Sequence, residues 1–219
     1  MTTTPLRWFA GSVQPLPESG RPSAMFKQNL SSPPVLDANG LHGDHQADRS
    51  VHGGPEKAVH VYPREHLAAL ARAFPALAEA LQAGALGENL SIAGLTEDVV
   101  RVGECWRLGD VVLQVCQPRQ PCWKIDDRLQ TEGVTAHIDA HGLTGWYCRV
   151  LQGGQVAADA VLQREEGAGP TLAQAPALSR QHRPAPADLQ ALAQTTGIAQ
   201  EWASKLRKRA EYLARLQSA

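Results

Sequence analysis

The sequence predicts an α+β fold, mainly β, in which short strands form a barrel and helices gather near the C-terminus. Turn residues such as Asn39-Gly40 recur throughout residues 1–170, and they separate apolar stretches that are short enough to be strands. Residues 171–219 instead carry apolar side chains at helical spacing. Short strands with few helices between them favour a closed or nearly closed barrel over a parallel α/β sheet.

Six apolar stretches are the expected strands: residues 57–62, 89–92, 99–103, 106–108, 111–117 and 146–151. The sequence Leu108-Gly109-Asp110-Val111 predicts a tight hairpin, because glycine and aspartate tolerate the backbone angles of such a turn. Alternation along a strand places successive side chains on opposite faces. It therefore predicts one face with Val59 and Val61 toward the core, and an opposite face with Ala58, His60 and Tyr62.

Helices are expected in two places. Within the β-rich part, apolar spacing predicts one helix from Pro63 to Phe74 and a second from Pro75 that stops at Gly84. Beyond a linker at 167–170, three helices are expected at residues 171–178, 186–196 and 199–218. The domain boundaries predicted from this pattern are a barrel at 1–166 and a three-helix domain at 171–219.

Composition excludes several classes of protein. The chain has 219 residues and a formal net charge of −1, which gives no general reason to expect a nucleic-acid partner. No stretch approaches the roughly 18 unbroken apolar residues of a membrane helix, and the start lacks the pattern of a secretory signal. Four cysteines are too few for a disulfide scaffold in a chain of this length. A cytoplasmic setting with free thiols is therefore expected.

The most informative residue is Cys122, which directly follows Pro121 and lies between Arg119 and Lys124. Nearby positive charge favours the thiolate, and the thiolate is the form that attacks substrates or binds metals. Because free cysteines are usually small buried hydrophobic residues, as expected for Cys116, a structural role stays open for Cys122 too. On these residues alone, Cys122 could also form a nucleophilic pair with a histidine, either His60 or His52.

A histidine-rich segment offers a second candidate site. The turn His52-Gly53-Gly54 exposes backbone N–H groups near Lys57, an arrangement that can hold a phosphate or another oxyanion. The same region offers zinc ligands in His42, Asp44, His45, Asp48 and His52. Their spacing matches no established zinc motif, so zinc is the weaker alternative.

Six motifs occur in a fixed order between residues 40 and 147: Gly40-Leu41-His42-Gly43-Asp44-His45-Gln46, His52-Gly53-Gly54-Pro55-Glu56-Lys57-Ala58, Tyr62-Pro63-Arg64-Glu65-His66, Gly87-Glu88-Asn89-Leu90, Gln117-Pro118-Arg119-Gln120-Pro121-Cys122 and Gly145-Trp146-Tyr147. Together they resemble the MOSC family, the domain named after the C-terminal part of molybdenum-cofactor sulfurases, in its YiiM-like branch. The C-terminal helices look like the three-helix extension of that branch. The resemblance implies a MOSC-type β-barrel that binds the molybdenum cofactor, a molybdopterin.

The resemblance also implies roles for individual residues. Cys122 stands in the place of the cysteine that ligates the metal, and such a soft thiolate suits molybdenum. His60 and Tyr62 are candidate proton donors. The candidates for holding the pterin or its phosphate are His52, Gly53, Gly54, Lys57, Arg119 and Lys124. Glu88 and Asn89 have two interpretations: contacts to the pterin edge, or a turn in which Glu88 pairs with Arg119 or Lys57.

The activity implied is reduction of N-hydroxylated substrates, such as 6-hydroxylaminopurine, to amines by cleavage of the N–O bond at molybdenum. The chain shows no dinucleotide fingerprint and no iron–sulfur spacing, so a separate reductase or ferredoxin-like electron donor is expected. The alternative is a sulfur carrier without redox activity that bears a persulfide on Cys122. A homodimer is left open, and a DNA-associated protein is disfavoured by the charge balance.

Overall fold

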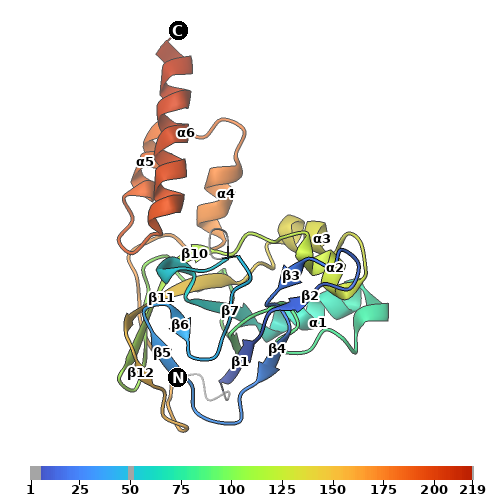
Figure 1. The fold of residues 1–219 in the computed structure, drawn as a ribbon. Helices are drawn as coiled ribbons and strands as arrows, with labels where there is room; N and C mark the ends of the chain where they lie inside the picture. Colours follow the sequence, from blue (N-terminus) through green and yellow to red (C-terminus); the bar gives the residue numbers. More distant parts are fainter. Residues whose placement is uncertain (1–5, 49–51, 219) are drawn as a thin grey trace.

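The centre of the protein is an eight-stranded sheet that curls into a half-barrel (Figure 1). The computed structural model describes residues 6–48 and 52–218, so residues 1–5 and 49–51 of the predicted barrel domain and residue 219 of the predicted three-helix domain lie outside the described part. The strand order in the sheet is β13-β9-β10-β11-β7-β8-β1-β4. These strands are β1 (Arg7–Gly11), β4 (Lys27–Asn29), β7 (Val59–Pro63), β8 (Leu90–Ile92), β9 (Cys105–Leu108), β10 (Val111–Pro118), β11 (Trp146–Gln152) and β13 (Gln163–Glu165).

Two small sheets and the helices complete the fold. One small sheet has the order β12-β5-β6 and the other pairs β2 with β3. The bounds are β2 (Gln14–Pro15), β3 (Pro22–Ser23), β5 (Val35–Asp37), β6 (Gly40–Leu41) and β12 (Gly154–Gln155). The α-helices are α1 (Arg64–Ala73), α2 (Lys124–Leu129), α3 (Val134–His141), α4 (Gln174–Arg180), α5 (Pro186–Ala193) and α6 (Gln200–Ser218), with 3₁₀ turns η1 (Pro55–Lys57) and η2 (Pro75–Leu77).

Strand pairing brings the ends of three strands together. All pairs in the large sheet are antiparallel except β7 with β8. In the register of β7 and β11, His60 lies beside Tyr147, and Pro118 at the end of β10 lies beside Trp146. The loop that leaves β10 toward Arg119 therefore starts at the same end of the sheet as His60, with β11 between the two strands.

Two apolar clusters form the core. The larger one joins the inside of the half-barrel to α5 and α6, and it includes Val59, Val61, Trp106 and Trp146. The smaller one contains Tyr62 and the buried faces of α1, α2 and α3. Helices α4 to α6 stand together at one end of the sheet (Figure 1). Because α5 and α6 share the larger cluster with the sheet, the division into domains at 166 and 171 stays a prediction.

The predicted fold class is confirmed, but the sheet is a half-barrel whose edge strands are β4 and β13 rather than a closed barrel. Five expected strands, the hairpin at 108–111, the first helix and the three C-terminal helices are present within a few residues of their expected bounds. None of the helices in the described ranges has both the length and the apolar character that crossing a membrane requires.

Two of the predictions were wrong, one for a strand and one for a helix. Residues 99–103 form turns instead of a strand, with one isolated bridge between Arg101 and Thr171. Residues 75–84 form the short turn η2 followed by further turns instead of a helix. The carboxylate of Glu88 accepts hydrogen bonds from the N–H groups of Gly84 and Leu86, at 2.5 and 3.1 Å. These local side-chain contacts hold the end of this segment as a turn where the apolar spacing alone predicted a helix.

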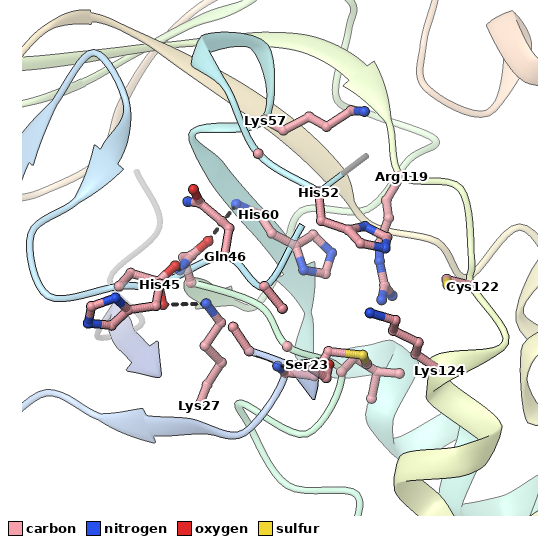
Figure 2. Close-up of a pocket in the computed structure, with 18 of the residues that line it drawn as sticks. Ser23, Lys27, His45, Gln46, His52, Lys57, His60, Arg119, Cys122 and Lys124 are labelled. Atoms are coloured by element: carbon pink, nitrogen blue, oxygen red, sulfur yellow. Dashed lines mark hydrogen bonds and ion pairs between the residues drawn. The ribbon is translucent and has the colours of Figure 1, made fainter. Parts of the chain in front are cut away.

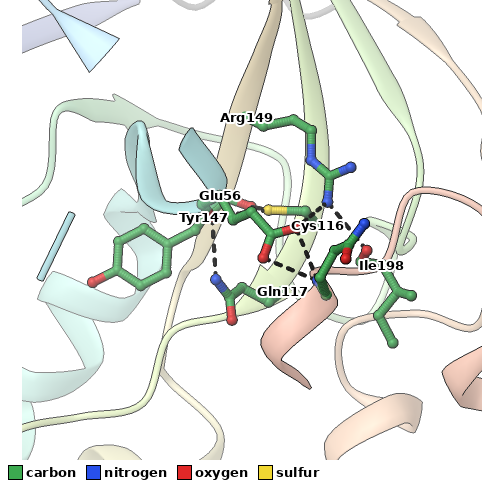
Figure 3. A network of polar contacts seen from close by, with 7 residues as sticks. Glu56, Cys116, Gln117, Tyr147, Arg149 and Ile198 are labelled. Carbon is green, nitrogen blue, oxygen red and sulfur yellow. Dashed lines mark hydrogen bonds and ion pairs between the residues drawn. The ribbon is translucent and has the colours of Figure 1, made fainter. Parts of the chain in front are cut away.

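Glu56 connects the N-terminus of α6 to the sheet (Figure 3). Its two carboxylate oxygens accept hydrogen bonds from the N–H of Gln200, the first residue of α6, at 2.8 and 2.9 Å. The same carboxylate pairs with Arg149 of β11 at 3.0 Å. The first N–H groups of a helix lack partners inside it, so a carboxylate placed there both satisfies and stabilises them.

Replacing Glu56 by Gln should lower the free energy of unfolding by about 1 kcal/mol, because the charge at the helix N-terminus and the pairing with Arg149 are lost. Urea denaturation measures this change. The matched control is Glu165→Gln, since Glu165 makes an exposed ion pair with Arg107 at 3.3 Å; its loss should cost less than about 0.5 kcal/mol. Equal effects of the two substitutions would contradict the capping role.

Candidate functional site

A pocket opens at the end of the sheet where β7, β10 and β11 meet the loops of the N-terminal half. Figure 2 shows Arg119, Cys122 and Lys124 on one side of this pocket and Lys27 and His45 on the other. Its lining residues are Ser23, Ala24, Met25, Lys27, Asp44, His45, Gln46, Ala47, His52, Gly53, Lys57, His60, Leu86, Gly87, Asn89, Arg119, Gln120, Cys122, Lys124 and Tyr147. The structure thus brings together most of the residues that the sequence singled out, from segments far apart in the chain.

Cys122 faces the pocket from the loop between β10 and α2, and it is partly buried. Its carbonyl oxygen accepts hydrogen bonds from the N–H of Ile125 at 2.9 Å and from the hydroxyl of Thr135 at 3.2 Å. These bonds tie the loop to α2 and α3, so the backbone of Cys122 is held at the wall of the pocket. Cys116 is buried instead, as predicted, and burial raises the pKa of its thiol to about 12.

Positive charge dominates the pocket. Among the described lining residues, four side chains are cationic and one, Asp44, is a carboxylate. Asp44 is already paired with Lys27 in a buried ion pair. Arg119 is 6% exposed, and within the described chain its Nη1 atom is buried without a hydrogen-bond partner. Because a buried charge is costly unless it is paired, this guanidinium is suited to bind an anion.

Two histidines border the cationic side chains. His60 is buried, and burial followed by the positive charge of Arg119 holds its pKa well below the ordinary value of 6.5. Its Nε2 atom has no hydrogen-bond partner in the part of the chain that the structure describes. The pKa of His52 is also lowered, first by burial and then by Lys124, Arg119 and Lys57. Both imidazoles are therefore neutral near pH 7 when the pocket holds no anion.

The two tyrosines near His60 lie in different places. Tyr62 does not line the pocket: its ring belongs to the core cluster of α1 to α3, and its hydroxyl donates a hydrogen bond to the carbonyl of Leu143 at 2.9 Å. Tyr147 does line the pocket, and its ring centre lies 5.3 Å from that of His60. Burial raises the pKa of Tyr147, opposed by the charge of Arg119. The structure therefore offers Tyr147, which the sequence analysis missed, in the position expected for Tyr62.

Glu88 and Asn89 hold the walls of the pocket in place. The Glu88 carboxylate bonds to N–H groups of its own turn, so the turn interpretation described this segment, but the partners are backbone groups instead of Arg119 or Lys57. The Asn89 side chain lines the pocket. Its oxygen accepts the N–H of His60 at 3.0 Å, and its nitrogen donates to the Phe9 carbonyl at 3.3 Å and to Asp44 at 2.9 Å. Both amide N–H groups are thus used within the protein.

The turn before Lys57 depends on two glycines with positive φ, 146° at Gly53 and 84° at Gly54. Gly53 lines the pocket, and a Cβ atom there would lie 3.0 Å from the side-chain oxygen of Gln46. Lys57 lines the pocket as well and pairs with Glu201 of α6 at 3.6 Å. The role of this turn as an oxyanion cradle stays a prediction.

The candidate zinc ligands do not gather into a metal site. Among residues 6–48 and 52–218, no group of three His, Cys, Asp or Glu side chains is placed to hold a metal ion. Asp44 is engaged by Lys27 and Asn89, and His42 pairs with Asp37 at the surface, 3.1 Å away. Lys27 is a further pocket residue that the sequence did not indicate, because it lies in a short strand without a recognisable motif.

Comparisons of the sequence and of the structure with known proteins find the same relatives. Residues 48–163 match the MOSC domain family. YiiM of Escherichia coli is 37% identical over 206 residues, which cover 94% of this chain and 92% of that protein. The crystal structure of YiiM from Escherichia coli superposes with a TM-score of 0.80 at 30% identity, over 95% of this chain and 92% of that one. A protein of Gibberella moniliformis named reductase is 36% identical over 135 residues, 61% of this chain and 24% of that protein.

The lowered pKa of His60 predicts a pH effect on stability. Below about pH 6.5 the unfolded chain binds a proton at this residue while the folded protein does not, so the free energy of unfolding falls as the pH falls. Replacing His60 by Gln should flatten the decrease between about pH 7 and pH 5, by at most about 1.4 kcal/mol per pH unit. Urea denaturation of the cofactor-free wild type and variant at both pH values measures this change in the free energy of unfolding. Parallel pH profiles for the two proteins would show that His60 is not buried as a neutral group.

Proposed function

This chain belongs to the MOSC domain family, and on that premise we propose that it is a molybdenum-cofactor-dependent reductase that converts N-hydroxylated substrates to amines. The observation that supports the proposal is the joint position of Cys122 and Arg119 in one pocket. Cys122 supplies a thiol at the pocket wall, and Arg119 supplies a buried positive charge with an unpartnered Nη1 atom.

The chemistry of the pocket suits a molybdopterin. Such a cofactor is anionic through its phosphate and its dithiolene sulfurs, and the pocket has an excess of positive charge, with four cationic side chains to one carboxylate. Arg119 and Lys124 lie on the same side as Cys122 (Figure 2), so we assign them to the anionic groups nearest the metal. His52, Gly53, Gly54 and Lys57 are assigned to the pterin or its phosphate. Glu88 and Asn89 use their side chains in hydrogen bonds within the protein, so we do not assign them the pterin contacts that the sequence left open.

Cys122 is the proposed ligand of molybdenum. A thiolate is a soft ligand that suits molybdenum, and the thiol must lose its proton before it binds a metal. When bound, the cofactor would supply the redox chemistry that cleaves the N–O bond. The protein orients it, excludes water and delivers protons.

Proton delivery is assigned to the side chains beside Arg119. A neutral imidazole still donates one hydrogen bond from its ring N–H. His60 lines the pocket, and its buried Nε2 atom has no hydrogen-bond partner in the described chain. A bound anion next to His60 would raise its lowered pKa and allow it to carry a proton. Tyr147 takes the role that the sequence gave to Tyr62, because its side chain is the one that reaches the pocket.

Reduction of an N-hydroxyl group to an amine and water consumes an electron pair and protons. We propose that a separate reductase or ferredoxin-like protein delivers the electrons. The relative named reductase supports an oxidoreductase activity, although the segment that resembles this chain is 24% of that protein. Weak redox encounters bury little surface, so their docking site leaves little trace in a single chain.

Replacing Cys122 by Ser should abolish reduction of 6-hydroxylaminopurine and remove most of the bound molybdenum, because a hydroxyl is a poor ligand for a metal that prefers a soft thiolate. The matched control is Cys105→Ser, since Cys105 is also a partly buried free thiol but does not line the pocket. Steady-state kinetics and metal analysis of both variants give the comparison.

Near wild-type turnover in Cys122→Ser would rule out the ligand role. A different result would favour the sulfur carrier: wild-type protein with labile sulfur on Cys122 and with neither molybdenum nor pterin. In that case the two variants would differ in bound sulfur rather than in reductase activity.

A further inference from the structure

A second cavity adjoins the pocket at Cys122. It lies between the Cys122 loop and the first turns of α6. It is lined by His52, Lys57, Gln117, Pro118, Gln120, Pro121, Cys122, Trp123, Tyr147, Glu201, Trp202 and Lys205. Cys122, Tyr147, His52, Lys57 and Gln120 line both spaces. The thiol that we assign to the metal therefore lies at the boundary between two cavities of different character.

We propose that this second cavity binds the substrate, and that Trp202 of α6 contacts the flat face of a ring-bearing N-hydroxylated compound. The inference rests on the proposed function and adds to it the place where the substrate binds and the side chain that contacts its ring. A substrate in this cavity would reach the boundary at Cys122 from the side opposite to Lys27, leaving the cationic pocket to the cofactor.

The residues of the cavity fit a planar, uncharged heteroaromatic ring. The indole rings of Trp202 and Trp123, the phenol of Tyr147 and two prolines offer flat apolar surfaces. Gln117 and Gln120 add amide groups, which can donate to and accept from the edge of such a ring.

The charged side chains that line the cavity, Lys57, Glu201 and Lys205, form one group of ion pairs. Glu201 pairs with Lys205 at 2.6 Å and with Lys57 at 3.6 Å. Two lysines thus face one carboxylate in this cavity, whereas four cationic side chains face one carboxylate in the first pocket. The two cavities are therefore suited to different molecules, an anion in the first and a neutral ring in the second.

Trp202 has a defined position because α6 is fixed at its start. The Glu56 carboxylate accepts hydrogen bonds from the N–H of Gln200, two residues before Trp202. Figure 3 shows Arg149 between Glu56 and Ile198, and its guanidinium donates to the Ile198 carbonyl at 3.1 Å. Trp202 is partly buried and packs against the larger core cluster, while it also lines the cavity. The C-terminal helices thus complete the substrate site rather than standing apart from it.

The test compares Trp202→Leu with Trp202→Phe. Leucine keeps apolar packing against the core but removes the aromatic face, whereas phenylalanine restores an aromatic ring. Isothermal titration calorimetry with 6-hydroxylaminopurine should show about tenfold weaker binding to Trp202→Leu, the usual effect of removing a stacking partner, and a smaller loss for Trp202→Phe. The matched control is Tyr212→Leu, on the same helix, 62% exposed and outside the cavity; it should bind like the wild type.

Kinetics provide the second arm. In Trp202→Leu the KM for 6-hydroxylaminopurine should rise about tenfold, while the KM for N-methylhydroxylamine, which has no ring, and the molybdenum content stay unchanged. Wild-type affinity for the purine in Trp202→Leu, with activity retained, would overturn this inference and leave the reductase proposal intact. A wild-type protein without reductase activity would instead reject the proposed function, and the calorimetric comparison would still decide whether Trp202 binds the ring.

Discussion

The site depends on the burial of a positive charge that the protein does not fully pair. The guanidinium of Arg119 carries five N–H donors and no acceptor, yet the residue is 6% exposed and its Nη1 atom has no partner in the described chain. The same charge lowers the pKa of His60 and opposes the rise in the pKa of Tyr147. Burying an incompletely paired charge costs free energy, and a bound anionic ligand would offset that cost. Arg119 is therefore the best single indicator of what the pocket binds.

The surrounding fold holds that charge in place. The N–H of Arg119 donates to the Gly145 carbonyl at 3.0 Å, which extends the pairing of β10 and β11 into the loop. A Cβ atom on Gly145 would lie 2.5 Å from the Val61 carbonyl and 3.2 Å from Nε2 of His60, so only glycine allows this close approach. The N–H of Gly145 is in turn held by Glu97 at 2.6 Å, and Glu97 pairs with His66. Buried polar contacts thus connect α1 to the wall of the pocket.

The sequence predicted the half of the site that lies in recognisable motifs. Cys122, Arg119 and Lys124 share one loop, and the His52 turn precedes β7, so local spacing was sufficient to connect these residues with one chemistry. Lys27 could not be found in this way, because only the pairing of β1 with β4 brings it near the motifs. Alternation identified the face of β7 that carries His60 and Tyr62. It could not show that Tyr62 packs against α1 to α3 while Tyr147 of the neighbouring strand fills the pocket.

The central claim is that the positive charge beside Cys122 is neutralised by a molybdenum-bearing pterin. It is tested most directly by metal analysis and pterin fluorescence of protein freshly purified from cells that make the cofactor. The account predicts molybdenum and pterin in near-equal amounts, approaching one of each per chain. Folded protein with a free Cys122 thiol and neither molybdenum nor pterin would contradict it.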